Sequence, residues 1–216
     1  MKQGVKRALS AVLILVLLLA GMFSYTQIKI KYYEDRFFPM KENFNELEQI
    51  VSWVTCYAYD ISDLRKNVGF YDYVFVGRIE EAEGTYYRDS FFSEKLQFYA
   101  QSETQYKITV LKNIKGNLKT NESIPMTKDG GLSCKGKYIE IGSGDPMPLE
   151  GHYYVLFAAT DEKGNVSLGV GNTLLGTDEE KATDENNPTV KKVMQAYENQ
   201  DESVRLGERY KSEYEK

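Results

Sequence analysis

Cys56 and Cys134 are the only two thiols of the chain, and two thiols can support several kinds of chemistry. They can form a disulfide, stay as a buried pair, or bind a metal ion. A zinc site usually needs four ligands at short spacings, and the single histidine is distant from both cysteines in the sequence. In an exported domain two cysteines most often pair. We therefore predict a disulfide that closes a loop of about 78 residues and stabilises the fold by roughly 4–5 kcal/mol.

The residue types suited to acid–base catalysis do not form a recognisable set. His152 opens a predicted strand, and general acid–base catalysis needs a partner within hydrogen-bond reach. Glu150 is too close in sequence to be aimed at it, so we predict a strand-end surface histidine. Asp72 and Asp89 are considered as paired carboxylates for glycoside chemistry, which needs a separation of about 5–9.5 Å. We assign no catalytic residue, no metal ligand and no cofactor.

Two glycine-containing loops invite comparison with ion-binding loops. Asp129–Gly131 lacks the alternating oxygen ligands of a calcium loop, and so does Gly142–Pro146. Neither has the Gly-Lys-Ser ending of a phosphate-binding loop. We predict that both are turns between strands.

An aromatic-rich segment, residues 84–105, separates the first two predicted strands. Rigid aromatic side chains are enriched at protein interfaces, and small barrels often bind through loops near their early strands. The segment is therefore a candidate partner-binding surface, and the alternative is that its rings extend the hairpin and cover the barrel end. Its aromatic residues are Tyr86, Tyr87, Phe91, Phe92, Phe98 and Tyr99.

An uncharged apolar run, Ala8–Phe23, follows Lys2, Lys6 and Arg7. A helix over residues 8–25 would be about 27 Å long, close to a hydrocarbon core of about 30 Å. Basic residues hold the preceding end in the cytoplasm. We predict a single-pass membrane anchor with the following domain outside the cell. The alternative is a signal peptide cleaved near Gly21 or Ser24, which would make the protein secreted.

The charge balance argues against nucleic acid as a partner. The chain carries a net charge of −5, and the three basic residues before the apolar run add +3, so the remainder carries −8. Binding nucleic acid or an anionic lipid surface requires clustered Lys and Arg, which the exported part lacks. The 17 Tyr and 10 Phe favour a β-rich globular domain.

Two further patterns flank the predicted β region. A mixed aromatic and basic stretch, residues 27–40, has the composition of the interfacial belt of a membrane protein. From residue 41, apolar residues recur at helical spacing, which predicts an amphipathic helix. These residues are Phe44, Leu47, Ile50, Val51 and Val54. A short capped helical turn over residues 60–67, closed by Gly69, is predicted next.

The remaining pattern predicts a small barrel of five or six strands. The strongest strands cover residues 71–80 and 106–116, and the second ends in a Gly116-Asn117 turn. Further strands are predicted over residues 123–127, 138–141, 152–159 and 166–170. Short strands with glycine-rich turns favour a closed barrel, which has no exposed sheet edges. After Gly176 the sequence becomes acidic, with a helix capped at Asn187-Pro188 and then a weakly held charged tail.

A family resemblance follows from this order. Cys56, then Tyr71-Asp-Tyr-Val-Phe-Val-Gly-Arg-Ile79, then Tyr106–Gly116, Cys134 and Leu149–Phe157 resembles netrin-like domains and tissue inhibitors of metalloproteinases. The resemblance covers residues 56–176 and implies an OB-like five-stranded barrel, as in small exported bacterial proteins of unassigned role. In the inhibitors, the mature chain begins at a cysteine whose free amine and carbonyl chelate the protease zinc. Here residues precede Cys56 and no Cys-x-Cys pair is present, so that activity would require a cut just before it.

These observations predict five segments and one leading function. The segments are a cytoplasmic basic start (1–7), an anchor or signal peptide (8–25), a stalk with an amphipathic helix (26–55), an OB-like barrel (56–176) and an acidic helical extension (177–216). The leading hypothesis is a membrane-anchored extracytoplasmic interaction module with an extracellular protein partner, and the absence of a catalytic set of residues favours it over an enzyme. The alternatives are an exported enzyme acting on cell-wall carbohydrate and a protease-inhibitor-like domain released by processing.

Overall fold

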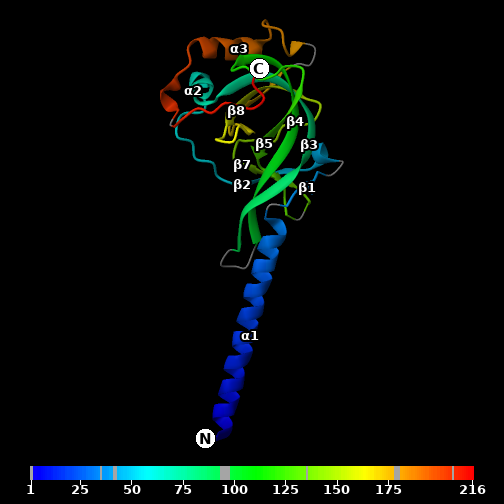
Figure 1. Cartoon of the computed structure of the whole chain (residues 1–216), viewed down its shortest axis with the longest axis vertical. Coiled ribbons are helices and arrows are strands. Elements are labelled where there is room, and N and C mark those ends of the chain that lie inside the picture. Colours follow the sequence, from blue (N-terminus) through cyan, green and yellow to red (C-terminus); the bar gives the residue numbers. More distant parts are fainter. Residues whose placement is uncertain are drawn as a thin grey trace. The chain divides into compact units, whose positions relative to one another are not determined.

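A computed structural model describes residues 2–34, 36–40, 43–92, 98–134, 136–177, 181–205 and 207–216, without the side chains of residues 2–8, 91 and 92. The chain forms two compact units. The first combines Met1–Arg36 with Tyr87–Gln101, and the second combines Phe37–Tyr86 with Ser102–Lys216. The element order is shown in Figure 1.

The first unit contains the longest helix, α1 (Lys2–Tyr33), drawn in blue in Figure 1. Its segment Leu9–Tyr33 is long and apolar enough to cross a membrane, and none of its most apolar window is buried. A signal sequence near an N-terminus would meet the same criteria of length and composition. The helix is longer than the predicted segment 8–25 at both ends, because helical structure includes the basic residues before the apolar run and continues through the aromatic and basic residues after it.

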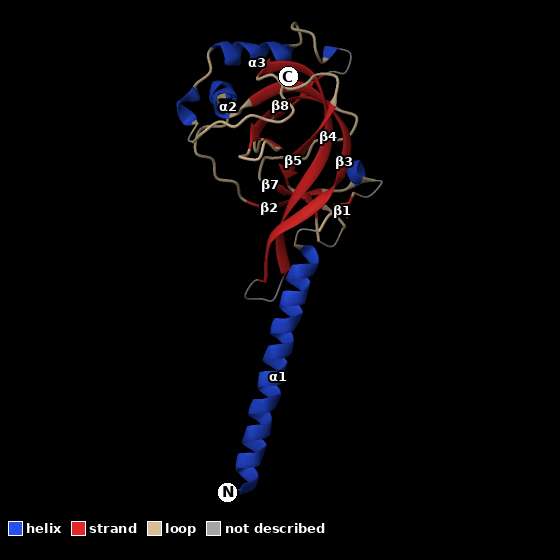
Figure 2. Ribbon diagram, in the orientation of Figure 1, coloured by secondary structure: helices blue, strands red, loops and turns tan. Residues whose placement is uncertain are grey.

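Five strands close into a barrel in the second unit, and the end of β3 and the start of β4 continue into the first unit. They are β3 (Tyr73–Phe92), β4 (Phe98–Lys115), β5 (Ser123–Asp129), β8 (Tyr153–Thr160) and β9 (Val166–Leu168). Hydrogen-bonded neighbours follow the order β3-β4-β5-β9-β8, and pairing of β3 with β8 closes the ring. The β5–β9 contact is parallel, whereas β4–β5, β8–β9 and β3–β8 are antiparallel. This five-stranded barrel confirms the predicted OB-like fold, mainly β with flanking helices (Figure 2).

Shorter elements extend the barrel. β1 (Phe38–Pro39) pairs with β3, and β10 (Leu174–Thr177) pairs with β8. A separate sheet contains β2 (Gln49–Trp53), β7 (Ile139–Gly142) and β6 (Gly131–Leu132). The helical elements are η1 (Phe44–Glu46), α2 (Leu64–Phe70), α3 (Pro188–Glu198) and η3 (Glu202–Val204). Asp63 caps α2 and Asn187 caps α3, as the sequence predicted for the second helix.

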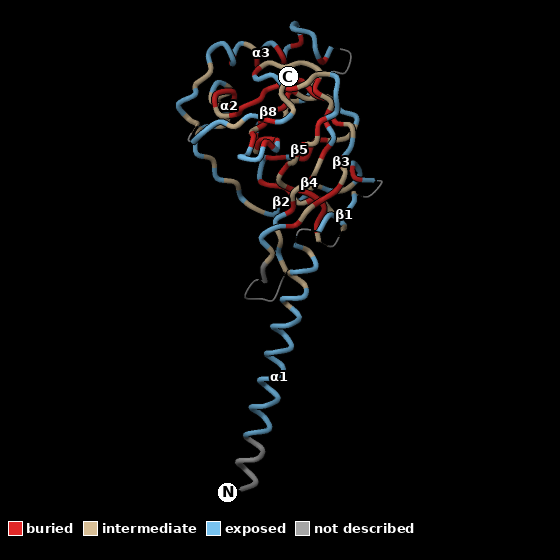
Figure 3. Tube along the Cα trace, in the orientation of Figure 1, coloured by how far each residue is buried: buried red, intermediate tan, exposed pale blue. Residues whose placement is uncertain are grey.

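Two hydrophobic clusters lie on opposite faces of β3 and β8. Side chains of β3 alternate, so Tyr73 and Phe75 join the barrel interior while Val74 and Val76 join a second cluster. The second cluster contains residues of α2 and α3, including Val190 and Val193 in α3. Burial on both faces explains why this part of β3 is almost continuously apolar in the sequence. The buried residues are red in Figure 3.

The predicted amphipathic helix over residues 41–54 is wrong. In the described part of this segment, the 3-10 turn η1 is followed by strand β2, which pairs in parallel with β7. Ile50, Val51 and Val54 are β-branched, and such residues favour strands over helices. Their spacing also fits a helix, but a backbone partner 90 residues further along, at Ile50↔Glu140 and Val51↔Ile141, favours the strand.

Candidate functional site

The first unit contains an aromatic cluster between α1 and the arms of the β3–β4 hairpin. The ring of Tyr33 lies 5.4 Å from that of Tyr87 in an edge contact and 4.8 Å from that of Phe98. The Lys29 ammonium lies 5.3 Å from the centre of the Phe98 ring and 6.0 Å from that of Tyr25. Such contacts contribute both ring packing and cation–π attraction. The hairpin arms are thereby fixed to the end of the helix.

The six predicted partner-binding aromatics are therefore in different environments. Tyr87 is buried, Phe98 is half-buried against α1, and Tyr99 is exposed over 47% of its surface. Tyr86 belongs to the second unit, where its ring lies 4.9 Å from that of Phe37. The side chains of Phe91 and Phe92 lie outside the described residues. The structure thus shows a packing role for several of these rings, and partner binding stays a prediction.

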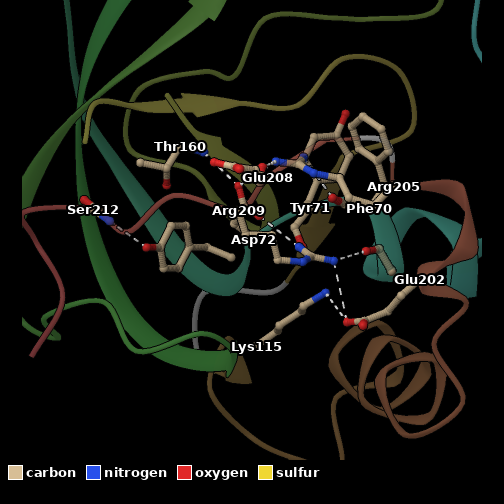
Figure 4. Close-up of polar contacts among 12 residues, drawn as sticks. Phe70, Tyr71, Asp72, Lys115, Thr160, Glu202, Arg205, Glu208, Arg209 and Ser212 are labelled. Carbon is tan, nitrogen blue, oxygen red and sulfur yellow. Dashed lines mark hydrogen bonds and ion pairs between the residues drawn. The ribbon is translucent and has the colours of Figure 1, made fainter. Parts of the chain in front are cut away.

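The second unit contains a polar cluster around Asp72, immediately before β3 (Figure 4). The Asp72 side chain is only 5% exposed. Its Oδ1 accepts a hydrogen bond from Arg209 Nη1 at 2.8 Å, and its Oδ2 accepts from Arg205 Nη2 at 3.3 Å and from the Thr160 amide at 3.0 Å. A buried carboxylate needs charge partners and hydrogen bonds of this kind to offset lost hydration.

The same two arginines also bind backbone carbonyls. Arg205 donates to the carbonyl of Phe70 at 3.0 Å, and Arg209 donates to the carbonyls of Tyr71 and Gly69. These carbonyls belong to the end of α2 and the residue after it. The guanidinium groups therefore bind both a carboxylate and the end of a helix, where partial negative charge favours cations.

Lys115, the last residue of β4, extends this cluster. Its ammonium donates to the carbonyl of Val68 at 2.7 Å and lies 3.6 Å from Glu202 Oε1. Burial lowers the pKa of Lys115 to about 8, and the nearby charge of Arg209 lowers it further, against the opposing effect of Glu202.

The contacts of Arg209 with Asp72 and with the end of α2 attach the C-terminal strap (residues 207–216) to the barrel. Within the strap, the Ser212 amide donates to Tyr73 Oη at 2.9 Å, and Tyr73 Oη donates to Glu215 Oε1 at 2.7 Å. Glu215 forms an antiparallel bridge with Leu118, and Tyr214 packs against the barrel core. The predicted weakly held helical tail is therefore wrong beyond α3 and η3, because buried hydroxyl, carboxylate and guanidinium groups provide partners for an extended segment.

A second buried ion pair joins strand β5 to the turn around Asp145. Lys128 Nζ lies 2.7 Å from Asp145 Oδ1, and the two side chains are 1% and 3% exposed. Lys128 also donates to the carbonyl of Gly169 at 3.0 Å, while the Gly171 amide donates to Asp145 Oδ1 at 3.0 Å. Burial lowers the pKa of Lys128, and the charge of Asp145 opposes that effect. The arrangement fixes the predicted turn around Asp145 to the loop between β9 and β10.

The predicted disulfide is not formed, because Cys56 and Cys134 are separate thiols. Cys56 follows β2, which is parallel to β7, and so comes after the Gly142 end of that sheet. Cys134 follows β6, which is antiparallel to β7, and so comes after the Ile139 end. β7 alone spans about 10 Å. A disulfide usually joins Cα atoms about 4.4–6.8 Å apart.

The remaining candidates do not come together as a catalytic site. His152 is exposed just before β8, and its Nδ1 lies 3.0 Å from the Glu150 carbonyl, so it is the strand-end residue that the sequence predicted. Asp89 belongs to the hairpin of the first unit and Asp72 belongs to the second unit. Among the described residues, no group of three or more His, Cys, Asp or Glu side chains could hold a metal ion.

Comparison of the sequence with protein-family models and with curated proteins finds no match to either. The site must therefore be interpreted from its own contacts. In the Asp72 cluster, each charged group has a partner that belongs to the fold. In the first unit, by contrast, apolar and aromatic side chains face outward.

Proposed function

We propose that the chain is a membrane-anchored extracytoplasmic interaction module, with the hairpin arms of the first unit as part of its contact surface. The observation that carries this proposal is α1, whose segment Leu9–Tyr33 places a continuous series of large apolar side chains in an exposed position. In water such a surface is unfavourable, whereas in a bilayer it is favourable. Lys2, Lys6 and Arg7 favour a cytoplasmic start and a barrel on the outer side.

The netrin-like assignment of the barrel is part of the same proposal. Its support is the strand order together with the sequence pattern of β3, β4 and β8, which an OB-like barrel accommodates. Fold likeness alone does not supply an activity.

The two alternatives from the sequence receive less support from the contacts. A carbohydrate-cleaving enzyme based on Asp72 and Asp89 would need Asp72 to face substrate, but its oxygens accept hydrogen bonds from Arg205, Arg209 and Thr160. An inhibitor with a free amine at Cys56 would need a cut after β2, which pairs with β7 within the fold. We therefore retain the interaction module.

Membrane extraction of the full chain tests the proposal. We expect the protein to remain in the membrane pellet at alkaline pH, with an intact mass that includes residues 1–25. Replacing Leu15 and Leu18 by Arg should release it, because each arginine opposes insertion by about 2.5–3.5 kcal/mol. The matched control replaces the same residues by Phe and should remain in the pellet. A soluble protein whose mass begins near Gly21 or Ser24 would contradict the anchor.

A further inference from the structure

We propose that the end of α1 and the hairpin arms form one lipid-contacting surface in the headgroup layer of the membrane. This inference rests on the proposed anchoring of α1. We call the surface the aromatic collar and define it by Tyr25, Lys29 and Tyr33 of α1 and Tyr87, Phe98 and Tyr99 of the hairpin. All six belong to the first compact unit.

The depth of the collar follows from the length of the apolar span. A hydrocarbon core of about 30 Å takes about 20 helical residues, which extends from Leu9 to Ile28. Lys29 is the first charged residue after Arg7, so the sequence places the edge of the hydrocarbon at the same point. Helix residues from Lys29 to Tyr33 then lie at headgroup level, and Tyr25, about one helical turn before Lys29, lies at the hydrocarbon edge of that layer.

The hairpin meets α1 at this same level. Phe98 packs beside Lys29 and Tyr33, and Tyr87 packs against Tyr33. An isolated bridge also joins Glu34 to Tyr87. Because these contacts lie within one compact unit, a membrane-spanning α1 places both hairpin arms beside the headgroups.

The chemistry of the collar suits this layer. Tyrosine combines an apolar ring with a polar hydroxyl and is enriched at membrane–water interfaces. Tyr25 and Tyr99 are exposed over 59% and 47% of their surfaces. The Arg36 guanidinium, 4.4 Å from the centre of the Tyr32 ring, and Lys29 supply cationic groups for lipid phosphates. This local charge differs from the acidic balance of the whole exported part.

The bilayer around the apolar part of α1 extends to the collar, which favours phospholipid over a protein as the molecule that contacts it. The hairpin contacts the very helix whose preceding turns are apolar and exposed, so the bilayer that covers those turns extends up to the collar. A protein partner would have to bind at the same depth and displace headgroups. We therefore assign the collar to phospholipid.

Tryptophan quenching by brominated lipid tests the assignment on the full chain. The variant Y99W is reconstituted in phosphatidylcholine vesicles with or without bromine near the headgroup end of the acyl chains. Trp53, the single native tryptophan, is kept, and its signal in the unsubstituted protein is subtracted. The controls are Y197W, at a position on α3 that is 38% exposed, and F23W, within the apolar span.

We expect quenching of Y99W at least about twice that of Y197W, as for other interfacial aromatic residues. If F23W is quenched and Y99W is quenched no more than Y197W, the lipid assignment is overturned while the anchor stands, and the exposed ring then faces solvent or a protein. If F23W is not quenched either, the anchoring proposal fails as well. Equal quenching at Tyr99 and Tyr197 would likewise overturn a collar-specific contact.

Discussion

The two ends of β3 use aromatic residues in opposite ways. At its start, Tyr73 is buried, and its hydroxyl binds Ser212 and Glu215 of the C-terminal strap. At its far end, the hairpin packs Tyr87 against α1, while Tyr99 on the returning strand is exposed over 47% of its surface. A buried ring whose hydroxyl has internal partners stabilises the fold, whereas a ring with part of its surface exposed can also contact the surrounding lipid or solvent. We call the start of β3, with Asp72 and Tyr73, the closed end, and the hairpin with Tyr87 and Tyr99 the open end. Variants at each end can test this division.

The largest expected effect is at the closed end. Replacing Asp72 by Ala leaves Arg205 and Arg209 without their shared carboxylate, so we expect the free energy of unfolding to fall by about 3–5 kcal/mol. Urea unfolding of the detergent-solubilised chain measures the change. The matched control is E81A, which removes an exposed partner of Lys107 and should cost less than about 1 kcal/mol. A loss at Asp72 no larger than that control would contradict the proposed role of the cluster.

A pH dependence is expected from Lys115. Its pKa in the folded state, about 8, lies below the ordinary value of 10.5, so the unfolded chain binds more protons between these values. The free energy of unfolding should therefore rise with pH, by about 2 kcal/mol from about pH 8 to about pH 10. In a K115M variant this rise should disappear. Parallel stability curves for the two proteins would show that burial of Lys115 does not lower its pKa.

A smaller effect is expected when one hydroxyl is removed. Y73F deprives the Ser212 amide of its acceptor and Glu215 of its donor, at a cost of about 1–2 kcal/mol. Amide hydrogen exchange should accelerate in the C-terminal strap before it does in α3. The control Y197F changes an exposed residue and should leave the exchange of the strap unaltered. Uniform acceleration across the barrel would mean that the strap is not a separate element.

The smallest effect on stability is expected at the open end. Y99S removes an exposed ring, so the free energy of unfolding should change by less than about 0.5 kcal/mol. In the same variant, labelling of the hairpin by a reagent dissolved in the lipid should nevertheless decrease. A loss of several kcal/mol would place Tyr99 in the fold rather than on the lipid-contacting surface.

The strands of the barrel could be predicted because their signals are local. Alternating or continuous apolar residues bounded by glycine turns identified β5, β8 and β9 close to their observed bounds. For β3 and β4 they identified only residues 71–80 and 106–116, whereas β3 continues to Phe92 and β4 begins at Phe98. The segment 84–105, predicted to separate the two strands, therefore contributes to both of them. Asn187-Pro188 identified the start of α3 for the same reason. The segment before Cys56 was predicted wrongly, because its apolar spacing fits both a helix and a strand, and only β7 decides between them.

The polar clusters could not be predicted from spacing alone. Arg205 and Arg209 lie more than 130 residues from Asp72, so no local pattern joins them. Two arginines four residues apart in an otherwise acidic segment were the available signal. The sequence signal for Lys128 is clearer, because alternation in β5 places this lysine on the same face as Ile124 and Met126. A lysine on the interior face of a strand indicates a buried carboxylate partner.

The orientation of the anchored chain can be measured with its own thiol. Cys56 is exposed, so in a C134S background a membrane-impermeant maleimide should label it on intact cells. In a variant with both cysteines replaced by Ser and with Lys2 replaced by Cys, labelling should occur only after permeabilisation. Labelling of Cys56 only after permeabilisation, with the thiol at position 2 reactive on intact cells, would contradict an extracytoplasmic barrel held by α1.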